Sequence, residues 1–323
     1  MFSYRHAFHA GNHADVLKHL VLVQLLRHFG LKETPFWVID THAGAGRYRL
    51  DGEWAARRGE FADGIGRLWE REQLRGREQL PAAVADYLDE VRALNPDGRL
   101  RHYPGSPFIT LRHLRPDDRL RLFELHSSES GVLAAGLAEA GPQARRQTRL
   151  EAADGFQGLK ALLPPPSRRA LVLIDPPYED KRDYARVPVA LREGLARFAT
   201  GCYAIWYPLV ARPEPAELAR KLRHLPGIRW LHASLSVRSP SADGLGLHGS
   251  AMFIVNPPWT LQAALGESLP WLVKVLGQDA GAQQTLTAGG EALSRAGEPA
   301  ARRSRRPAGP ANPAPARSPA GRR

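Results

Sequence analysis

The sequence predicts an α/β protein built on a mostly parallel, seven-stranded sheet with helices on both faces. Short runs rich in aliphatic and aromatic residues alternate with helical stretches such as "SGVLAAGLAEA" and "PAELARKLRHL". This alternation is typical of parallel sheets whose strands are joined by helices. With 323 residues, 43% of them hydrophobic, the chain is long enough for one large α/β domain or two smaller ones.

The predicted elements follow one another in a clear order. Residues 14–29 have the apolar stripe of a helix, which Asn12 or Asp15 can cap and Gly30 can end. "PFWVID" at 35–40 is a short buried strand, and residues 53–96 are a helical insertion without a strand-like run. The six remaining strand-like runs cover 119–126, 145–155, 169–178, 201–208, 230–238 and 250–259.

Residues 1–277 are expected to form the folded domain, and residues 278–323 a disordered tail rich in Ala, Pro and Arg. The tail has no aromatic residue and cannot bury enough apolar surface to order itself. Eight arginines and two glutamates lie between residues 280 and 323, so this stretch carries half of the formal net charge of +12. This basic balance favours a polyanionic partner, with nucleic acid ahead of an anionic membrane.

The remaining composition indicates a cytoplasmic protein. Cys202 is the single cysteine, so no disulfide can form within the chain, and a reducing compartment fits. The first residues are polar and rich in histidine, unlike a signal peptide. We also expect no membrane span, because no stretch reaches about 18 apolar residues.

Chemistry is expected just after each strand, because ligands of open α/β sheets bind beyond the carboxyl ends of the strands. The first strand ends in "DTHAGAG", which places His42, Gly44 and Gly46 after Asp40. Glycines here let the backbone pass close under a ligand. The pattern differs from the dinucleotide fingerprint G-x-G-x-x-G, and the alternative is a tight turn.

The next two strands also end on carboxylates. Glu124 in "FELH" can accept both hydroxyls of a ribose, although it lies much farther from the first strand than the usual distance of about 20 residues. The helical insertion explains this gap, and the alternative is a solvated charge. Asp154, before Gly155, can accept from an adenine amino group, but Asp-Gly is also a common turn pair.

The fourth strand runs into "LVLIDPPYED" at 171–180. An exocyclic amine on an aromatic ring is a poor nucleophile, because its lone pair is delocalised into the ring. The carboxylate of Asp175 and the carbonyl of Pro176 can accept the two amine hydrogens and expose the lone pair to an electrophile. The consecutive prolines hold both acceptors in place, and Tyr178 offers a face on which a base can stack. Asp175, Pro176 and Tyr178 are therefore the candidate catalytic residues, and a strand followed by a turn is the alternative.

"FIVNPPWTL" repeats this pattern at Asn256 and Trp259. Asparagine also supplies an acceptor oxygen, so spacing alone does not separate the two motifs. Position does, because the fourth strand lies next to the first in a doubly wound sheet and the last strand lies far from it. We interpret Asn256 as a structural strand exit.

Taken in order, these motifs resemble those of bacterial large-subunit ribosomal RNA adenine-N6-methyltransferases of the RlmJ type. The resemblance covers residues 1–275 and rests on "SYRHAFHAGNHADVLKH", "DTHAGAGRY", "YPGSP", "ELH", "ADGF", "LIDPPYE", "RFATGCYAIWYP" and "NPPW". It does not extend to the basic tail.

The resemblance implies a Rossmann-like methyltransferase fold with S-adenosylmethionine as the methyl donor. The resemblance implies that Lys18 lies near the methionine carboxylate of the donor. The full set of implied donor-binding residues is Lys18, His19, His42, Gly44, Ser106, Glu124, Asp154 and Gly155. Asp175 becomes the catalytic acceptor, and Tyr4 contacts the substrate RNA.

Two further features have open interpretations. His9 and His13 are four residues apart, as zinc ligands can be, but the sequence offers no cysteine or H-E-x-x-H pattern near them, and we expect no metal. The insertion interleaves arginines with Trp54, Phe61 and Trp69, which suits either RNA backbone contacts or a solvated face over an apolar one.

The sequence therefore predicts a monomeric enzyme that methylates the N6 amine of one adenine in 23S ribosomal RNA. The base would leave its stack and be recognised on its Watson–Crick edge. A DNA adenine-N6 methyltransferase remains an alternative, since D-P-P-Y does not distinguish RNA from DNA. A non-catalytic RNA-binding assembly factor is the second alternative.

Overall fold

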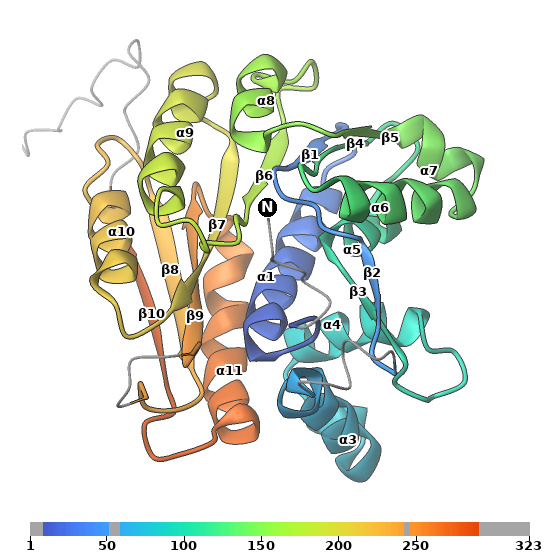
Figure 1. Cartoon of the computed structure of the whole chain (residues 1–323), viewed down its shortest axis with the longest axis vertical. Helices are drawn as coiled ribbons and strands as arrows, with labels where there is room; N and C mark the ends of the chain where they lie inside the picture. The colour runs from blue at the N-terminus through green and yellow to red at the C-terminus, as the bar shows by residue number, and fades with distance from the viewer. Residues whose placement is uncertain (1–8, 52–58, 242–245, 291–323) are drawn as a thin grey trace, which may run out of the picture. The chain divides into compact units, whose positions relative to one another are not determined.

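In the computed structural model, which describes residues 9–51, 59–241 and 246–290, an eight-stranded sheet forms the centre of the fold (Figure 1). Its strands are β1 (Trp37–Asp40), β4 (Arg119–Phe123), β5 (Thr148–Glu151), β6 (Ala170–Ile174), β7 (Cys202–Leu209), β8 (Trp230–Ser236), β9 (Gly249–Val255) and β10 (Gln283–Gly289). They lie in the order β10-β8-β9-β7-β6-β1-β4-β5. All seven predicted strands are present, and β10 is an eighth.

The strands β5, β4, β1, β6 and β7 are mutually parallel. Strand β6 lies between β1 and β7, and all five of its residues are buried. A continuous apolar run such as "ALVLI" is typical of a parallel strand covered on both faces. The order and direction of these strands bring Asp40, Phe123 and Ile174 to one edge of the sheet.

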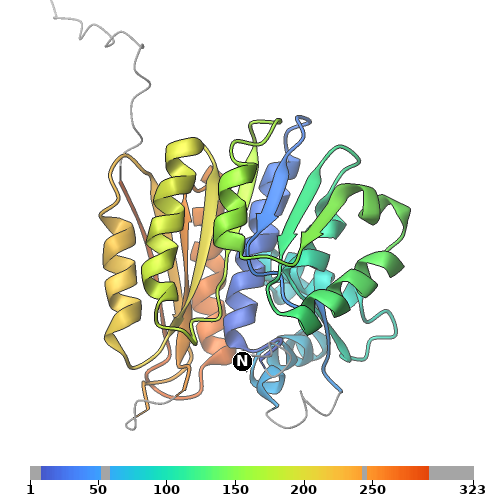
Figure 2. The same ribbon diagram turned by 45° about the horizontal axis from the view of Figure 1, so that its top comes forward.

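Helices cover both faces of the sheet (Figures 1 and 2). Residues of α1 (His13–Gly30), α5 (Ser106–His113), α6 (Ser127–Glu139) and α11 (Trp259–Leu276) share one hydrophobic cluster with one face. Residues of α8 (Gly155–Leu162), α9 (Asp183–Arg197) and α10 (Pro213–Arg223) share the second cluster with the other. Val38 and Ile39, neighbours in β1, belong to different clusters, as alternation along a strand requires.

Helix α1 is buried along most of its length and begins where the sequence predicts. The Asn12 side chain accepts from the backbone N–H groups of Ala14 (2.9 Å) and Asp15 (3.0 Å), which caps the helix. Its apolar residues are not confined to one stripe, because the helix packs against β9, α4, α5 and α11. A helix of this kind belongs to the core.

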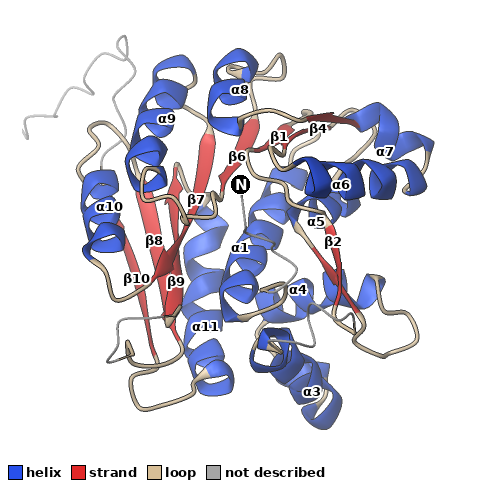
Figure 3. Cartoon of the chain, in the orientation of Figure 1, coloured by secondary structure: helices blue, strands red, loops and turns tan. Residues whose placement is uncertain are grey.

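The helical insertion lies between two short strands that the sequence analysis did not predict. β2 (Arg47–Arg49) and β3 (His102–Pro104) pair antiparallel and stand apart from the central sheet (Figure 3). Between them come η2 (Glu60–Asp63), α3 (Ile65–Arg75), η3 (Arg77–Gln79) and α4 (Ala82–Ala93). Ile65, Leu68 and Trp69 pack α3 onto the core, while Arg71 and Arg75 are exposed. Helix α7 (Pro142–Gln147) joins α6 to β5.

The prediction of a disordered tail from residue 278 is wrong at its start. Gln283–Gly289 forms β10, which pairs antiparallel with the whole of β8. Its backbone makes the ladder, and Leu286 is packed against the core. Composition averaged over the tail hid this strand, because pairing with β8 needs few apolar side chains. Residues 291–323 lie outside the described part, so the rest of that prediction is not addressed.

The helices of the described part include none that is both long and apolar enough to cross a bilayer.

Truncation after Gly277 should destabilise the protein, whereas truncation after Gly290 should not. The first removes β10 and exposes the edge of β8; the second leaves the sheet intact. We expect the shorter chain to lose about 2–8 °C in Tm, because a loss of about 1–2 kcal/mol lowers the Tm of a large domain by about 2–4 °C per kcal/mol. Thermal unfolding followed by circular dichroism tests this, and equal Tm values for the two truncations would contradict a structural role for β10.

Candidate active site

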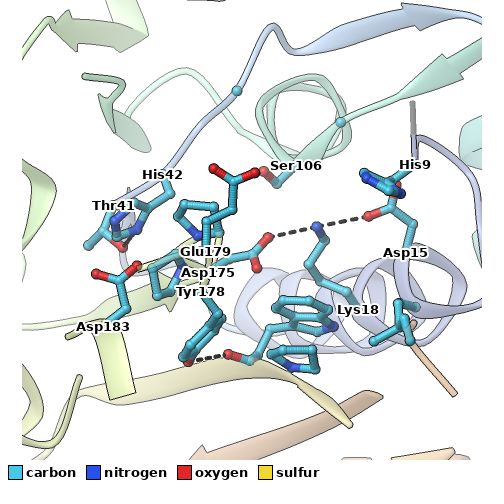
Figure 4. A pocket seen from close by; sticks show the side chains of 18 of the residues that line it. His9, Asp15, Lys18, Thr41, His42, Ser106, Asp175, Tyr178, Glu179 and Asp183 are labelled. Carbon is cyan, nitrogen blue, oxygen red and sulfur yellow. Dashed lines mark hydrogen bonds and ion pairs between the residues drawn. The ribbon is translucent and has the colours of Figure 1, made fainter. Parts of the chain in front are cut away.

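A cavity of about 960 Å³ lies beyond the carboxyl ends of β1, β4, β5, β6 and β7 (Figure 4). It is lined by every predicted site residue that the structure describes: Lys18, His19, His42, Gly44, Ser106, Glu124, Asp154, Gly155, Asp175, Pro176 and Tyr178. Tyr4 lies outside the described residues. Segments far apart in the sequence thus converge on one cavity.

Asp40 organises the loop that follows β1. Its buried carboxylate accepts from the Ser106 hydroxyl (2.6 Å) and from the His42 backbone N–H (3.2 Å). Burial raises the pKa of Asp40 to about 6, although these two hydrogen bonds act in the opposite direction. Ser106, the first residue of α5, is thereby held at the cavity wall with its lone pairs available as acceptors.

Glu124 ties the loop after β1 to the loop after β4. One carboxylate oxygen accepts from the Gly44 N–H (2.8 Å) and the other from the His126 N–H (2.7 Å). Gly44 has a φ of +61°, which favours glycine at this position. Each Glu124 oxygen keeps a further lone pair, so the fixed carboxylate can still accept from the hydroxyls of a ligand.

The loop after β5 closes against the loop after β1. A Cβ on Gly155 would lie 2.1 Å from the Thr41 carbonyl oxygen, so only glycine permits this approach. Asp154 caps α8 by accepting from the Phe156 N–H (2.9 Å) and forms an ion pair with Arg186. The sequence analysis missed Arg186, since no local motif marks it within α9.

His42 is a neutral group in this part of the cavity. Burial lowers its pKa to about 3, and its ring packs edge-on against Phe156 at 4.9 Å between centroids. His19 of α1 also lines the cavity and is buried, with its Nδ1 2.7 Å from the Tyr103 hydroxyl. A neutral imidazole is compatible with a neighbouring cationic ligand, because it adds no like charge.

Lys18 joins the N-terminal helix to the end of β6. Its ammonium lies 2.8 Å from Asp15 and 2.6 Å from Asp175, as Figure 4 shows. Burial alone would lower the Lys18 pKa, but the two carboxylates raise it well above its ordinary value. Lys18 therefore stays charged and orients the Asp175 carboxylate, a partner that the sequence analysis did not foresee.

The turn after Asp175 is fixed by Tyr178. This residue adopts a left-handed φ of +55°, and its hydroxyl donates to the Trp206 carbonyl oxygen (2.8 Å). Its ring packs against Tyr184, with centroids 4.5 Å apart, and is 6% exposed. Trp206, which also lines the cavity, is a second aromatic ring here that sequence analysis overlooked.

Asn256 lies at the opposite edge of the sheet, because β9 runs antiparallel to β7. Its amide donates to the carbonyl oxygens of Ala199 (2.7 Å) and Gly201 (2.8 Å). Asn256 thus anchors a strand exit and does not line the cavity.

His9, which precedes α1, forms an ordinary polar contact. His9 Nδ1 lies 2.8 Å from Glu60. Within the described ranges, no group of three or more His, Cys, Asp or Glu residues is arranged to hold a metal ion.

Comparison with known proteins places this chain in a family. The model of the family described as "Ribosomal RNA large subunit methyltransferase D, RlmJ" matches residues 33–287. The chain belongs to the RlmJ family. It is 46% identical over 272 residues to ribosomal RNA large subunit methyltransferase J of Escherichia coli K12, covering 84% of this chain and 93% of that protein. The Haemophilus influenzae protein of the same name is 45% identical over 277 residues, covering 85% and 94%.

The solved structure of protein LPL1258 from Legionella pneumophila also resembles this RlmJ-family chain. It is 32% identical, has a TM-score of 0.76, and the match covers 88% of this chain and 99% of that one. The predicted resemblance and the predicted Rossmann-like methyltransferase fold are confirmed, with eight strands in place of seven.

Glu124→Ala should weaken binding of S-adenosylmethionine by about 1.5–3 kcal/mol, the range for hydrogen bonds to a charged group. The variant removes the carboxylate that would accept from the ribose hydroxyls, and it removes the hydrogen bond from the Gly44 N–H. Isothermal titration calorimetry measures the effect, with Glu193→Ala on α9 as the control because Glu193 lies outside the cavity lining. Unchanged affinity would place Glu124 outside the donor site.

Lys18→Met should destabilise the fold by about 3–5 kcal/mol, because it leaves buried carboxylates without their cation. Adding Asp15→Asn should recover part of this loss, since Asp15 is only 2% exposed and becomes neutral. Urea unfolding of both variants provides the measurement. If the double variant is no more stable than Lys18→Met, the buried charge is not the cause.

Proposed function

We propose that this protein transfers a methyl group from S-adenosylmethionine to the N6 amine of one adenine in 23S ribosomal RNA. The observation that carries the proposal is the Asp175-Pro176 turn at the end of β6, beside the interlocked loops after β1, β4 and β5. The family of large-subunit ribosomal RNA methyltransferases supplies the class of substrate.

The residues around the loops after β1, β4 and β5 fit the donor. Glu124 presents fixed carboxylate oxygens to the ribose hydroxyls, and Asp154 with Gly155 lies where the adenine end would be read. The close approach of Gly155 to Thr41 holds the loops after β5 and β1 together, and a Cβ on Gly155 would push them apart. His42, Ser106 and His19 complete the donor contacts, and Gly44 shapes the loop. When bound, the donor supplies an electrophilic methyl group on a sulfonium.

Asp175 and Pro176 prepare the attacking amine. The Asp175 carboxylate and the Pro176 carbonyl accept the two N6 hydrogens, which frees the nitrogen lone pair for in-line attack. The ion pair with Lys18 orients the Asp175 carboxylate before the base enters. After transfer, the nitrogen loses a proton and regains its conjugation with the ring.

The substrate base must leave its stack to reach this depth. Tyr178 and Trp206 line the cavity on the side away from β4 and β5, where the base would enter. Tyr4 is the further RNA contact that the resemblance implies. The described residues that line the cavity come from several segments of one chain, which supports a monomer, and a ribosomal RNA substrate supports action in the cytoplasm. Neither a DNA methyltransferase nor a non-catalytic assembly factor is favoured.

Asp175→Asn should lower the rate of methyl transfer by about 10²–10³-fold, the usual cost of losing one electrostatic contact in the transition state. Donor binding should persist, because Asp175 lies outside the loops assigned to the donor. Single-turnover transfer to an unmodified 23S ribosomal RNA transcript and calorimetry with S-adenosylmethionine measure the two effects.

Asp117→Asn is the matched control, since Asp117 is an exposed carboxylate outside the cavity lining. Near-wild-type transfer by Asp175→Asn would remove Asp175 from its proposed role. Mapping of 6-methyladenine in the product RNA, with duplex DNA tested in parallel, decides whether the wild-type protein has the proposed substrate.

A further inference from the structure

We propose that Arg212 and Arg238 bind the phosphate groups of the RNA segment that carries the target adenine. This inference rests on the proposed function. The two arginines would form the surface that binds the polyanionic substrate next to the same site. Both arginines line the active-site cavity on the side of β7 and β8, away from β4 and β5.

The topology places the two side chains at the same edge of the sheet. Leu209 at the end of β7 and Ser236 at the end of β8 both pair with Gly249, the first residue of β9. Arg212 follows β7 directly, and Arg238 follows β8. Strands β7 and β8 flank β9, so their ends are about 10 Å apart. The two arginines therefore border one side of the cavity mouth.

The cavity as a whole does not favour a polyanion. Ten of its lining residues are Asp or Glu and five are Lys or Arg, so its walls carry excess negative charge. This charge suits a cationic methyl donor and repels RNA phosphates. RNA binding at this mouth needs cations that the cavity carboxylates have not already neutralised.

Three of the five cationic side chains already form ion pairs with carboxylates. Lys18 pairs with Asp15 and Asp175, Arg182 pairs with Asp180, and Arg186 pairs with Asp154. Each of these ion pairs removes the positive charge from use by an incoming phosphate.

Arg212 and Arg238 make no ion pair in the described part of the chain. Glu214, the carboxylate beside Arg212, is held by Lys181 at 2.7 Å. Arg238 donates one N–H to the Leu247 carbonyl oxygen (3.3 Å), which orients the guanidinium and leaves other donors available.

The chemistry of these side chains fits phosphate. A guanidinium presents a planar fork of donors that matches phosphate oxygens. A flipped nucleotide also requires its flanking backbone to be held while the base is out of its stack. Arg212 is exposed and Arg238 half-buried, so both can reach a chain lying across the mouth.

The test compares the wild-type protein with the variants Arg212→Ala, Arg238→Ala, their double variant and the double lysine variant. Binding of a 23S ribosomal RNA transcript is measured over a salt series. Arg229→Ala is the matched control, because Arg229 is also exposed and without an ion pair in the described part, but lies at the opposite edge of the sheet, before β8.

We expect the double alanine variant to reduce the slope of log affinity against log salt by about 1.4, from two contacts at about 0.7 each for single-stranded nucleic acid. It should raise KM for the RNA more than it lowers kcat. The double lysine variant should keep the slope because it keeps the charge, and Arg229→Ala should match wild type. Affinity for S-adenosylmethionine should be unchanged in all variants, which also shows that they are folded.

An unchanged salt slope in the double alanine variant would overturn the proposal. So would a loss of donor affinity in Arg238→Ala, because Arg238 would then serve the donor carboxylate. If the double variant does not fold, the single variants and the double lysine variant give the same comparison. Failure of the proposed function has a different signature, namely a wild-type protein that forms no 6-methyladenine in the transcript.

Discussion

The buried ion pairs of Lys18 with the carboxylates of Asp15 and Asp175 connect the N-terminal helix to the Asp175-Pro176 turn. The Lys18 side chain is only 6% exposed, so its ammonium would be strongly destabilising without nearby carboxylates. Both ion pairs therefore contribute to the stability of the folded protein. Asp15 also accepts a hydrogen bond from the Gly11 N–H (2.9 Å), so the segment before α1 is held by the same carboxylate. Helix α1 therefore belongs to the active site as much as to the core.

The side of the cavity formed by the loops after β1, β4 and β5 is held in place by other contacts. Its loops are joined by backbone contacts that only glycine permits or that carboxylates complete: Gly44 donates to Glu124, and Gly155 lies against Thr41. Asp154 is held by its capping bond and by Arg186. These contacts fix three loops relative to one another before a ligand binds, which reduces the entropy lost on binding.

The two proposed ligands of the cavity carry opposite charges. A sulfonium donor favours acidic walls, whereas an RNA chain requires positive charge. The structure separates these charges in space. Paired cations lie within the carboxylate-lined walls, and Arg212 and Arg238, which form no ion pair with the described residues, lie on the side of β7 and β8. Separation of this kind lets one cavity accept a cation and a polyanion in adjacent positions.

The sequence by itself determined the seven main strands, the start of α1 at its Asn12 cap, and the residues at the strand ends that line the cavity. These features depend on local patterns: apolar runs, a capping side chain, and polar residues where strands stop. Only the tertiary structure decided that Lys18 pairs with Asp175, 157 positions away, and that Arg186 pairs with Asp154. It also decided that residues 283–289 form a strand, because they pair with β8. No local pattern specifies such contacts, because their free energy comes from groups brought together by the folded chain.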